Sequence, residues 1–187
     1  KRTEALGTPD MRVTEYEVNP LGQTESVTLK GRIETNGTLT RDAITSISYD
    51  RSGSVKEIVD PEGGRNQFQH DRSGNIVVAI DPRGHKNVME FNAQGLLVNI
   101  TDAVNRLYSY QYDKAGNLTK EIDADASEIR YYYDQLNRLT RTIYPSNSIS
   151  TIQYDAQGMV IASSDEDGRS INAEYDNYQR LSKVSDA

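Results

Sequence analysis

Apolar and polar residues alternate in short runs along most of the chain, and the runs return at a fixed spacing. An aromatic residue or a substitute for one, followed by an acidic or amide residue, recurs every 21 residues without insertion or deletion. The recurring pairs are Tyr49-Asp50, His70-Asp71, Phe91-Asn92, Tyr112-Asp113, Tyr133-Asp134, Tyr154-Asp155 and Tyr175-Asp176. A constant period of this length is typical of a repeat protein, in which each unit is too small to bury its own apolar face and depends on its neighbours.

We number each repeat from its aromatic residue, which is position 0. The residues before it alternate, as in Tyr110 and Tyr112, which predicts a strand that ends at position 0. A second run follows, with an aliphatic residue at position 6 of every copy and often another at position 10, such as Leu118 and Ile122. Because alternate side chains of a strand share a face, we expect positions 6, 8 and 10 on one face. The mixed residues at position 8 make that face only patchily apolar.

Two turns separate the predicted strands of each repeat. Asp at position 1 followed by Gly at position 4 is the signature of a type I β-turn, in which the Asp side chain caps the turn and Gly takes a left-handed conformation. Position 4 is a glycine at Gly53, Gly74, Gly95, Gly116 and Gly158. The second turn begins at position 11, as in Asp60 to Gly63 and Asp81 to Gly84, where a proline in second place presets the backbone angle.

The sequence therefore predicts an all-β fold of repeated antiparallel β-hairpins, one per 21-residue repeat, that form one long, curved and twisted sheet. Residues 49–187 are expected to form an array of seven repeats, the last one incomplete. Residues 1–48 are expected to be a divergent N-terminal segment that is also β-structured. We expect one aromatic, concave face and one charged, convex face.

Composition limits the classes of function. The formal net charge is −7 and the lysines and arginines are scattered, which argues against nucleic acid as a partner. No apolar stretch approaches the roughly 18 residues that a membrane-spanning helix needs. The chain has no cysteine, so a disulfide framework and a cysteine-based zinc site are excluded. The first residues, from Lys1 onward, do not resemble a secretory signal peptide.

The repeat explains each candidate for catalysis or metal binding. His70 takes an aromatic position, and His85 directly follows a turn glycine. Residues 165–168 resemble the start of a calcium loop, but the later ligands are missing and the stretch falls where the repeat demands a turn. Carboxylates recur at turn positions in every copy, whereas an active site is normally a single constellation. We therefore predict no catalytic residue, no metal site, no cofactor and no enzyme activity.

Tyrosines from two neighbouring repeats form the candidate ligand face, which consists of Tyr110, Tyr112, Tyr131 and Tyr133. Rows of aromatic side chains can stack on sugars or hold an apolar peptide. The alternative is that they are cross-strand packing pairs, each of which stabilises a sheet by about 0.2–1 kcal/mol. Packing is the favoured interpretation, and carbohydrate or protein binding stays open beside it.

The residues in these positions resemble a known family. Residues 112–119 (YDKAGNLT) and 133–140 (YDQLNRLT) are similar to the YD repeat of the RHS family, as are residues 48–53 and 81–84. The family includes bacterial polymorphic toxins, insecticidal toxin complexes and animal teneurins. The resemblance implies that the chain is a piece of the wall of a hollow shell, which a long wound β-sheet forms.

The resemblance also implies a function. In the bacterial toxins the shell holds a C-terminal toxin domain away from the producing cell. We therefore expect a structural, secreted or cell-surface segment whose partners are further RHS repeats and a C-terminal toxin domain of the same chain. The alternative is a cell-surface module that binds carbohydrate or protein. Because an isolated segment leaves strand edges and an apolar face uncovered, we also expect it to self-associate.

Overall fold

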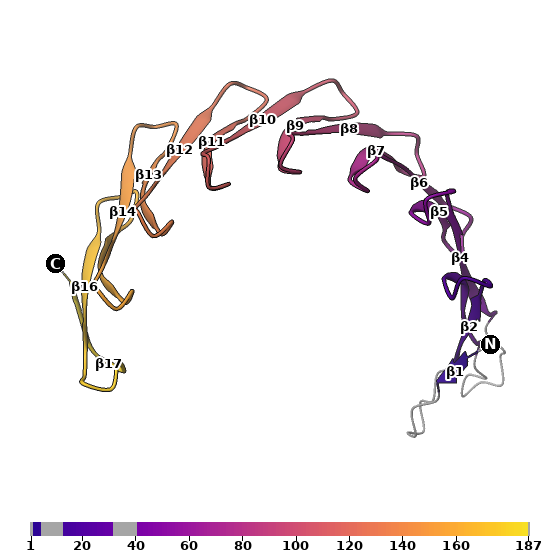
Figure 1. The fold of residues 1–187 in the computed structure, drawn as a ribbon, viewed down its shortest axis with the longest axis horizontal. Helices are drawn as coiled ribbons and strands as arrows, with labels where there is room; N and C mark the ends of the chain where they lie inside the picture. Colours follow the sequence, from indigo (N-terminus) through magenta and orange to yellow (C-terminus); the bar gives the residue numbers. More distant parts are fainter. Residues whose placement is uncertain (1, 5–12, 32–40, 187) are drawn as a thin grey trace. The chain divides into compact units, whose positions relative to one another are not determined.

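The computed structural model describes residues 2–4, 13–31 and 41–186. In these residues the chain consists of 17 β-strands and the turns between them, and it contains no helix. It divides into two compact units, unit 1 (Lys1–Met89) and unit 2 (Glu90–Ala187). Within each unit the strands lie in a single curved layer (Figure 1). The predicted all-β fold of repeated antiparallel hairpins is confirmed.

Unit 1 is an antiparallel meander in which each strand pairs with the next along the chain. Its strands are β1 (Arg2–Glu4), β2 (Thr14–Val18), β3 (Thr24–Leu29), β4 (Ala43–Tyr49), β5 (Val55–Val59), β6 (Arg65–His70), β7 (Ile76–Ile80) and β8 (Lys86–Phe91), the last of which crosses the end of the unit. The short turns allow only antiparallel neighbours, because a parallel pair needs a long crossover.

Unit 2 repeats the same pattern. Its strands are β9 (Leu97–Thr101), β10 (Leu107–Tyr112), β11 (Leu118–Ile122), β12 (Glu128–Tyr133), β13 (Leu139–Ile143), β14 (Ile149–Tyr154), β15 (Val160–Ser164), β16 (Ser170–Tyr175) and β17 (Leu181–Asp186). Even-numbered strands end at position 0, and the odd-numbered strand that follows begins at position 6. Each 21-residue repeat therefore supplies two adjacent strands.

The turn after position 0 has the same hydrogen bonds in one repeat after another. In the turn that starts at Asp50, the Gly53 N–H donates to the Asp50 carbonyl at 3.1 Å, and the Asp50 N–H donates to the Ser54 carbonyl at 2.9 Å. The Asp50 carboxylate also accepts bonds from the backbone N–H groups of Ser52 and Ser54 at 2.8 and 3.0 Å. Asp thus satisfies backbone donors that the turn would otherwise leave unpaired.

The last residue of each turn adopts a left-handed backbone, with φ of 86° at Gly53 and 90° at Gly116. Five turns place another residue there, with φ between 60° and 67°: Asn105, Ala126, Asn137, Asn147 and Gln179. Asn tolerates this region better than most residues. Alanine has neither glycine's freedom nor a polar side chain, so Ala126 is the conformationally strained member of the set.

Replacing Ala126 with glycine should stabilise the chain by about 0.5–1 kcal/mol. The change removes a left-handed penalty of roughly 1–2 kcal/mol, and the greater freedom of glycine in the unfolded state offsets part of the gain. Urea unfolding measures the difference. The matched control is Ala115→Gly in the neighbouring turn, where φ is not positive and the same change should lower stability. Equal effects at both sites would contradict the assignment of strain to Ala126.

A β-bulge accompanies the turns that start at position 1 in seven hairpins, and the sequence pattern did not reveal it. Tyr112 pairs with Leu118, but the preceding residue Gln111 pairs with Lys120, so Thr119 is left without a direct partner. The same one-residue shift occurs in six other hairpins of this kind. An extra residue in one strand reverses the faces of the side chains beyond it.

The bulge corrects the expected face of position 10. Leu118 at position 6 lies on the tyrosine face, because it pairs with Tyr112. Beyond the bulge it is Glu121, at position 9, that faces the same way as Tyr110, while Ile122 at position 10 pairs with Ser109 on the opposite face. The expectation that positions 6 and 10 share a face was therefore wrong. The aliphatic side chains at positions 6 and 10 therefore lie on opposite faces of the sheet.

A single layer cannot bury many side chains. When backbone and side chain are counted together, only Val78 and Thr142 are buried among the residues whose burial is described, at 8% and 5% exposed. Most side chains on both faces are half-buried against their neighbours in the adjacent strands. Contacts between successive strands, rather than a thick core, therefore hold the repeats together, as is usual for a linear repeat array.

Candidate functional site

A row of hydrogen bonds from position-0 tyrosines joins four successive repeats of unit 2 to the repeat before each of them. Each hydroxyl donates to the carbonyl of the residue 15 positions earlier, which is position 6 of the preceding repeat. The bonds run from Tyr112 to Leu97 (2.8 Å), Tyr133 to Leu118, Tyr154 to Leu139 and Tyr175 to Val160 (2.9 Å each). We call this set the tyrosine ladder.

The repeats before Tyr112 show where the ladder begins and where it is interrupted. Tyr49 donates to the carbonyl of Thr24 at 2.7 Å. Thr24 is six residues after Val18, so Val18 occupies position 0 of an earlier repeat that contains ten extra residues. Phe91 has no hydroxyl. The His70 side chain is only 8% exposed, but its Nδ1 atom has no hydrogen-bond partner and lies 3.9 Å from an Asp50 carboxylate oxygen.

The four tyrosines of the candidate ligand face do point the same way. Tyr110 and Tyr112 alternate along β10, and Tyr131 and Tyr133 alternate along β12. Glu121 of β11 pairs directly with Tyr110 on one side and with Ile129 of β12 on the other, so all these side chains lie on one face. Tyr132 lies on the opposite face.

Glu121 is the residue of this cluster that sequence reasoning missed. Position 9 carries Ile58, Ala79, Ile100, Thr142, Ser163 and Val184 in the other repeats, so Glu121 is the single charge in an otherwise uncharged column. That irregularity was visible in the sequence. The sequence did not show that Glu121 lies beside the tyrosines, because the bulge determines which face position 9 occupies.

Burial and the Glu121 carboxylate both act on the surrounding phenols. Burial is the larger cause and the negative charge of Glu121 the next, and together they raise the pKa of Tyr131 to about 12. The pKa values of Tyr110, Tyr112 and Tyr133 are also raised, first by burial and then by neighbouring negative or phenolic groups that include Glu121. These tyrosines therefore keep their protons and remain hydrogen-bond donors at physiological pH.

A cavity of about 290 Å³ opens beside this cluster. Its lining residues are Tyr108, Tyr110, Glu121, Ile122, Asp123, Ser127, Ile129 and Pro145. Two aromatic rings, two carboxylates and three aliphatic side chains thus meet around one opening. Of the four tyrosines of the candidate ligand face, only Tyr110 lines this cavity.

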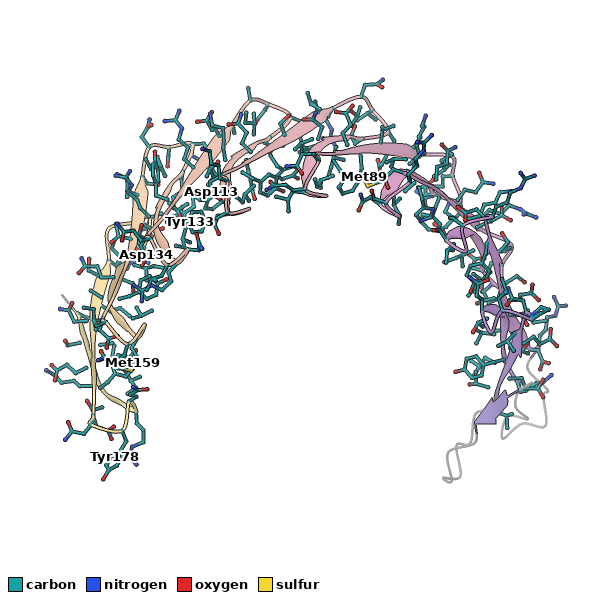
Figure 2. All side chains as sticks on the ribbon, in the orientation of Figure 1. Met89, Asp113, Tyr133, Asp134, Met159 and Tyr178 are labelled. Carbon is teal, nitrogen blue, oxygen red and sulfur yellow. The ribbon has the colours of Figure 1, made fainter. Side chains whose placement is uncertain are left out.

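The aspartates and His85, which the sequence analysis also considered, lie in turns, and the aspartates stabilise those turns. The carboxyl pKa of Asp113 is lowered chiefly by the Asn117 side chain, and that of Asp134 chiefly by the backbone N–H of Arg138. Asp113 lies close to Tyr133 of the next repeat (Figure 2), and its charge contributes to the raised pKa of that phenol. His85 sits on an exposed turn with Nδ1 2.8 Å from an Asp81 oxygen.

Two further properties of the described residues bear on function. They contain no group of three or more His, Cys, Asp or Glu side chains arranged to hold a metal ion. No helix in this part of the chain has the length and apolar character that a membrane crossing would require.

These features define a linear array of β-hairpin repeats, five of which are tied to the preceding repeat by a tyrosine. The family model described as RHS Repeat matches residues 91–128 and 112–149. Over residues 91–149 the match confirms the resemblance to the RHS family, also called the YD-repeat family, that the sequence indicated. No curated protein matches it.

Solved structures share the fold over almost the whole chain. The crystal structure of TcdB2–TccC3–Cdc42 matches with a TM-score of 0.76 and 14% identity, and TcdB2–TccC3 with 0.74 and 14%. A Photorhabdus luminescens Tc holotoxin pore with a substitution in TccC3 matches with 0.73 and 14%. In all three the match covers 94% of this chain but only 11% of the other.

Proposed function

We propose that the chain is a wall segment of an RHS shell that encloses a C-terminal toxin domain. The observation that carries the proposal is the tyrosine ladder. In four successive repeats the position-0 side chain forms a hydrogen bond to the preceding repeat. The similarity of the fold to chains of Tc toxin structures supports it. In this proposal residues 49–187 are seven repeats of the wall, and residues 1–48 are a divergent N-terminal segment.

The proposed role is mechanical rather than catalytic. Backbone groups of neighbouring strands pair with each other, the turn aspartates cap the hairpin ends, and the tyrosines prevent adjacent repeats from separating. A wall of this kind excludes proteases and water from what it encloses without turning over a substrate. We propose that its partners are further RHS repeats and a toxin domain, and that it acts outside the producing cell.

Limited proteolysis of the full-length protein that carries this segment tests the role. The C-terminal region should resist digestion in the full-length protein and be cleaved rapidly when it is expressed alone. Replacing Tyr112, Tyr133 and Tyr154 with alanine should open the wall and restore rapid cleavage of the C-terminal region. If that region is cleaved equally fast in both proteins, it is not enclosed.

A second candidate function is recognition of carbohydrate or of a cell-surface protein. The observation that favours it is the common orientation of Tyr110, Tyr112, Tyr131 and Tyr133 on one face. Binding to a glycan array that disappears in the Tyr110→Ala, Tyr131→Ala double variant, with the fold retained, would support this function.

We also propose that the isolated chain self-associates. In the described residues β17 pairs only with β16, so its other edge has free backbone donors and acceptors. Leu181 and Val184 on this strand are more than half exposed. Exposed strand edges with apolar side chains favour edge-to-edge pairing. Light scattering should show oligomers at micromolar concentration, and a monomer over a wide concentration range would contradict the proposal.

A further inference from the structure

Glu121 is a carboxylate on the tyrosine face without a cation of its own. Among the described residues it forms no salt bridge, and neither does Asp123 on the same cavity wall. Four turn aspartates of this unit pair with an arginine of their own turn, as Asp134 does with Arg138 at 2.7 Å and Asp176 with Arg180 at 2.7 Å. The cavity beside Glu121 therefore concentrates negative charge that the chain does not neutralise with an ion pair.

Arg106 interacts electrostatically with Tyr108 and Asp123 of the cavity, and it is already engaged. Its Nε atom binds an Asp102 carboxylate oxygen at 2.7 Å, and its guanidinium carbon lies 6.0 Å from the centre of the Tyr108 ring. It thus sits at the outer limit of a cation–π contact. Asp123 acts on Arg106 only through longer-range attraction. The interior of the cavity, between Tyr110 and Glu121, remains open to another cation.

The size and chemistry of the cavity select one class of occupant. At about 290 Å³ it is at the small end of ligand pockets, which suits a single side chain better than several sugar rings. A planar guanidinium can stack on a tyrosine ring while it donates paired hydrogen bonds to a carboxylate. The same chain shows such stacking elsewhere, with Arg141 4.0 Å from the centre of Tyr132 and Arg138 4.4 Å from that of Tyr154.

We propose that the cavity lined by Tyr108, Tyr110, Glu121 and Asp123 binds an arginine side chain of a polypeptide partner. Glu121 accepts the guanidinium hydrogen bonds, Tyr110 supplies the stacking ring, and Ile129 and Pro145 contact the aliphatic part of the side chain. The net charge of −7 favours the approach of a basic partner. The proposal does not depend on enclosure of a toxin, since the site would act equally on an enclosed or an external polypeptide.

Titration of the 187-residue chain with the blocked tripeptide Gly-Arg-Gly, followed by NMR, tests the proposal. The peptide should perturb the resonances of Tyr110 and Glu121 in a saturable way. The matched probe is Gly-citrulline-Gly, which keeps the shape of the side chain but lacks its charge and should bind at least tenfold more weakly. Binding of both probes with equal affinity would overturn the assignment.

Variants locate the binding. Glu121→Gln keeps the shape of the side chain and should weaken binding of the arginine peptide at least tenfold, and Asp123→Asn should weaken it about threefold. Glu174→Gln on β16 removes the same charge far along the chain and should change nothing. Unchanged affinity in Glu121→Gln, or a response to cellotriose in place of the arginine peptide, would refute an arginine site.

Stability is measured beside affinity for each variant. Since Glu121 is a charge on a half-buried face, Glu121→Gln should leave the urea midpoint unchanged or raise it. If Glu121→Gln does not fold, the Asp123→Asn result decides, because Asp123 is exposed. Proteolysis of the full-length protein has no bearing on these measurements, so failure of the shell proposal and failure of this one are distinguishable.

Discussion

Replacing Tyr133 with alanine should destabilise the chain by about 3 kcal/mol. The change removes a half-buried ring, which costs up to about 3–5 kcal/mol in a full core, and less in a single layer. It also removes the hydroxyl that bonds the Leu118 carbonyl at 2.9 Å. Because that bond joins two repeats, its loss weakens the contact between neighbouring hairpins, on which the stability of a linear array depends. Urea unfolding followed by circular dichroism gives the difference.

The neighbouring Tyr132 is the matched control. It lies on the opposite face, is 37% exposed and stacks with Arg141, so Tyr132→Ala should cost about 1 kcal/mol or less. Tyr133→Phe keeps the ring and should cost about 1 kcal/mol, the usual contribution of one hydrogen bond. A larger loss for Tyr132→Ala than for Tyr133→Ala would show that the tyrosine ladder does not carry the stability of the array.

The fold could be predicted from the sequence because the 21-residue repeat specifies the strands and turns of each hairpin. Tyr, Asp and Gly at positions 0, 1 and 4 specify a strand end, a capped turn and a left-handed residue, and their recurrence without a gap leaves only a meander of hairpins. Where the pattern lapses, the geometry persists. Ala126 and Gln179 hold left-handed backbones although neither residue favours them, because the flanking strands impose the turn.

What the sequence could not reveal depends on the bulge and on contacts between repeats. Strict alternation predicted Ile122 on the same face as Leu118. The extra residue Thr119 exchanges the two faces of the strand beyond the bulge, so Glu121 lies on the tyrosine face instead. The tyrosine ladder was equally hidden. Its acceptors are backbone carbonyls of the preceding repeat, and no side-chain pattern marks a carbonyl. The sequence therefore indicated that the four tyrosines share a face, but not that a carboxylate lies beside them.

The chain should lose stability steeply as the pH falls below about 4. Folding lowers the carboxyl pKa of Asp113, Asp134 and Asp176 from the ordinary value of 3.8, through hydrogen bonds from Asn117, Arg138 and Arg180 respectively. Asp50, Asp71, Asp81 and Asp102 shift in the same direction. A lowered pKa means that the folded state prefers the ionised carboxyl. The stabilisation is complete above the unfolded value and disappears as the pH falls through the folded values.

Asn92 shows how this acid sensitivity can be removed without removing the turns. Its side-chain oxygen accepts bonds from the backbone N–H groups of Gln94 and Leu96 at 3.0 Å each, as the aspartates do in other repeats, but it has no proton to gain. The triple variant Asp113→Asn, Asp134→Asn, Asp176→Asn should therefore fold and show a shallower loss of urea midpoint between pH 5 and pH 2. Wild-type midpoints that stay flat over this range would mean that the turn carboxylates contribute no ionisation-linked stability. A variant as acid-sensitive as the wild type would assign the effect to other carboxylates, such as Glu57 and Glu128, whose pKa values are also lowered.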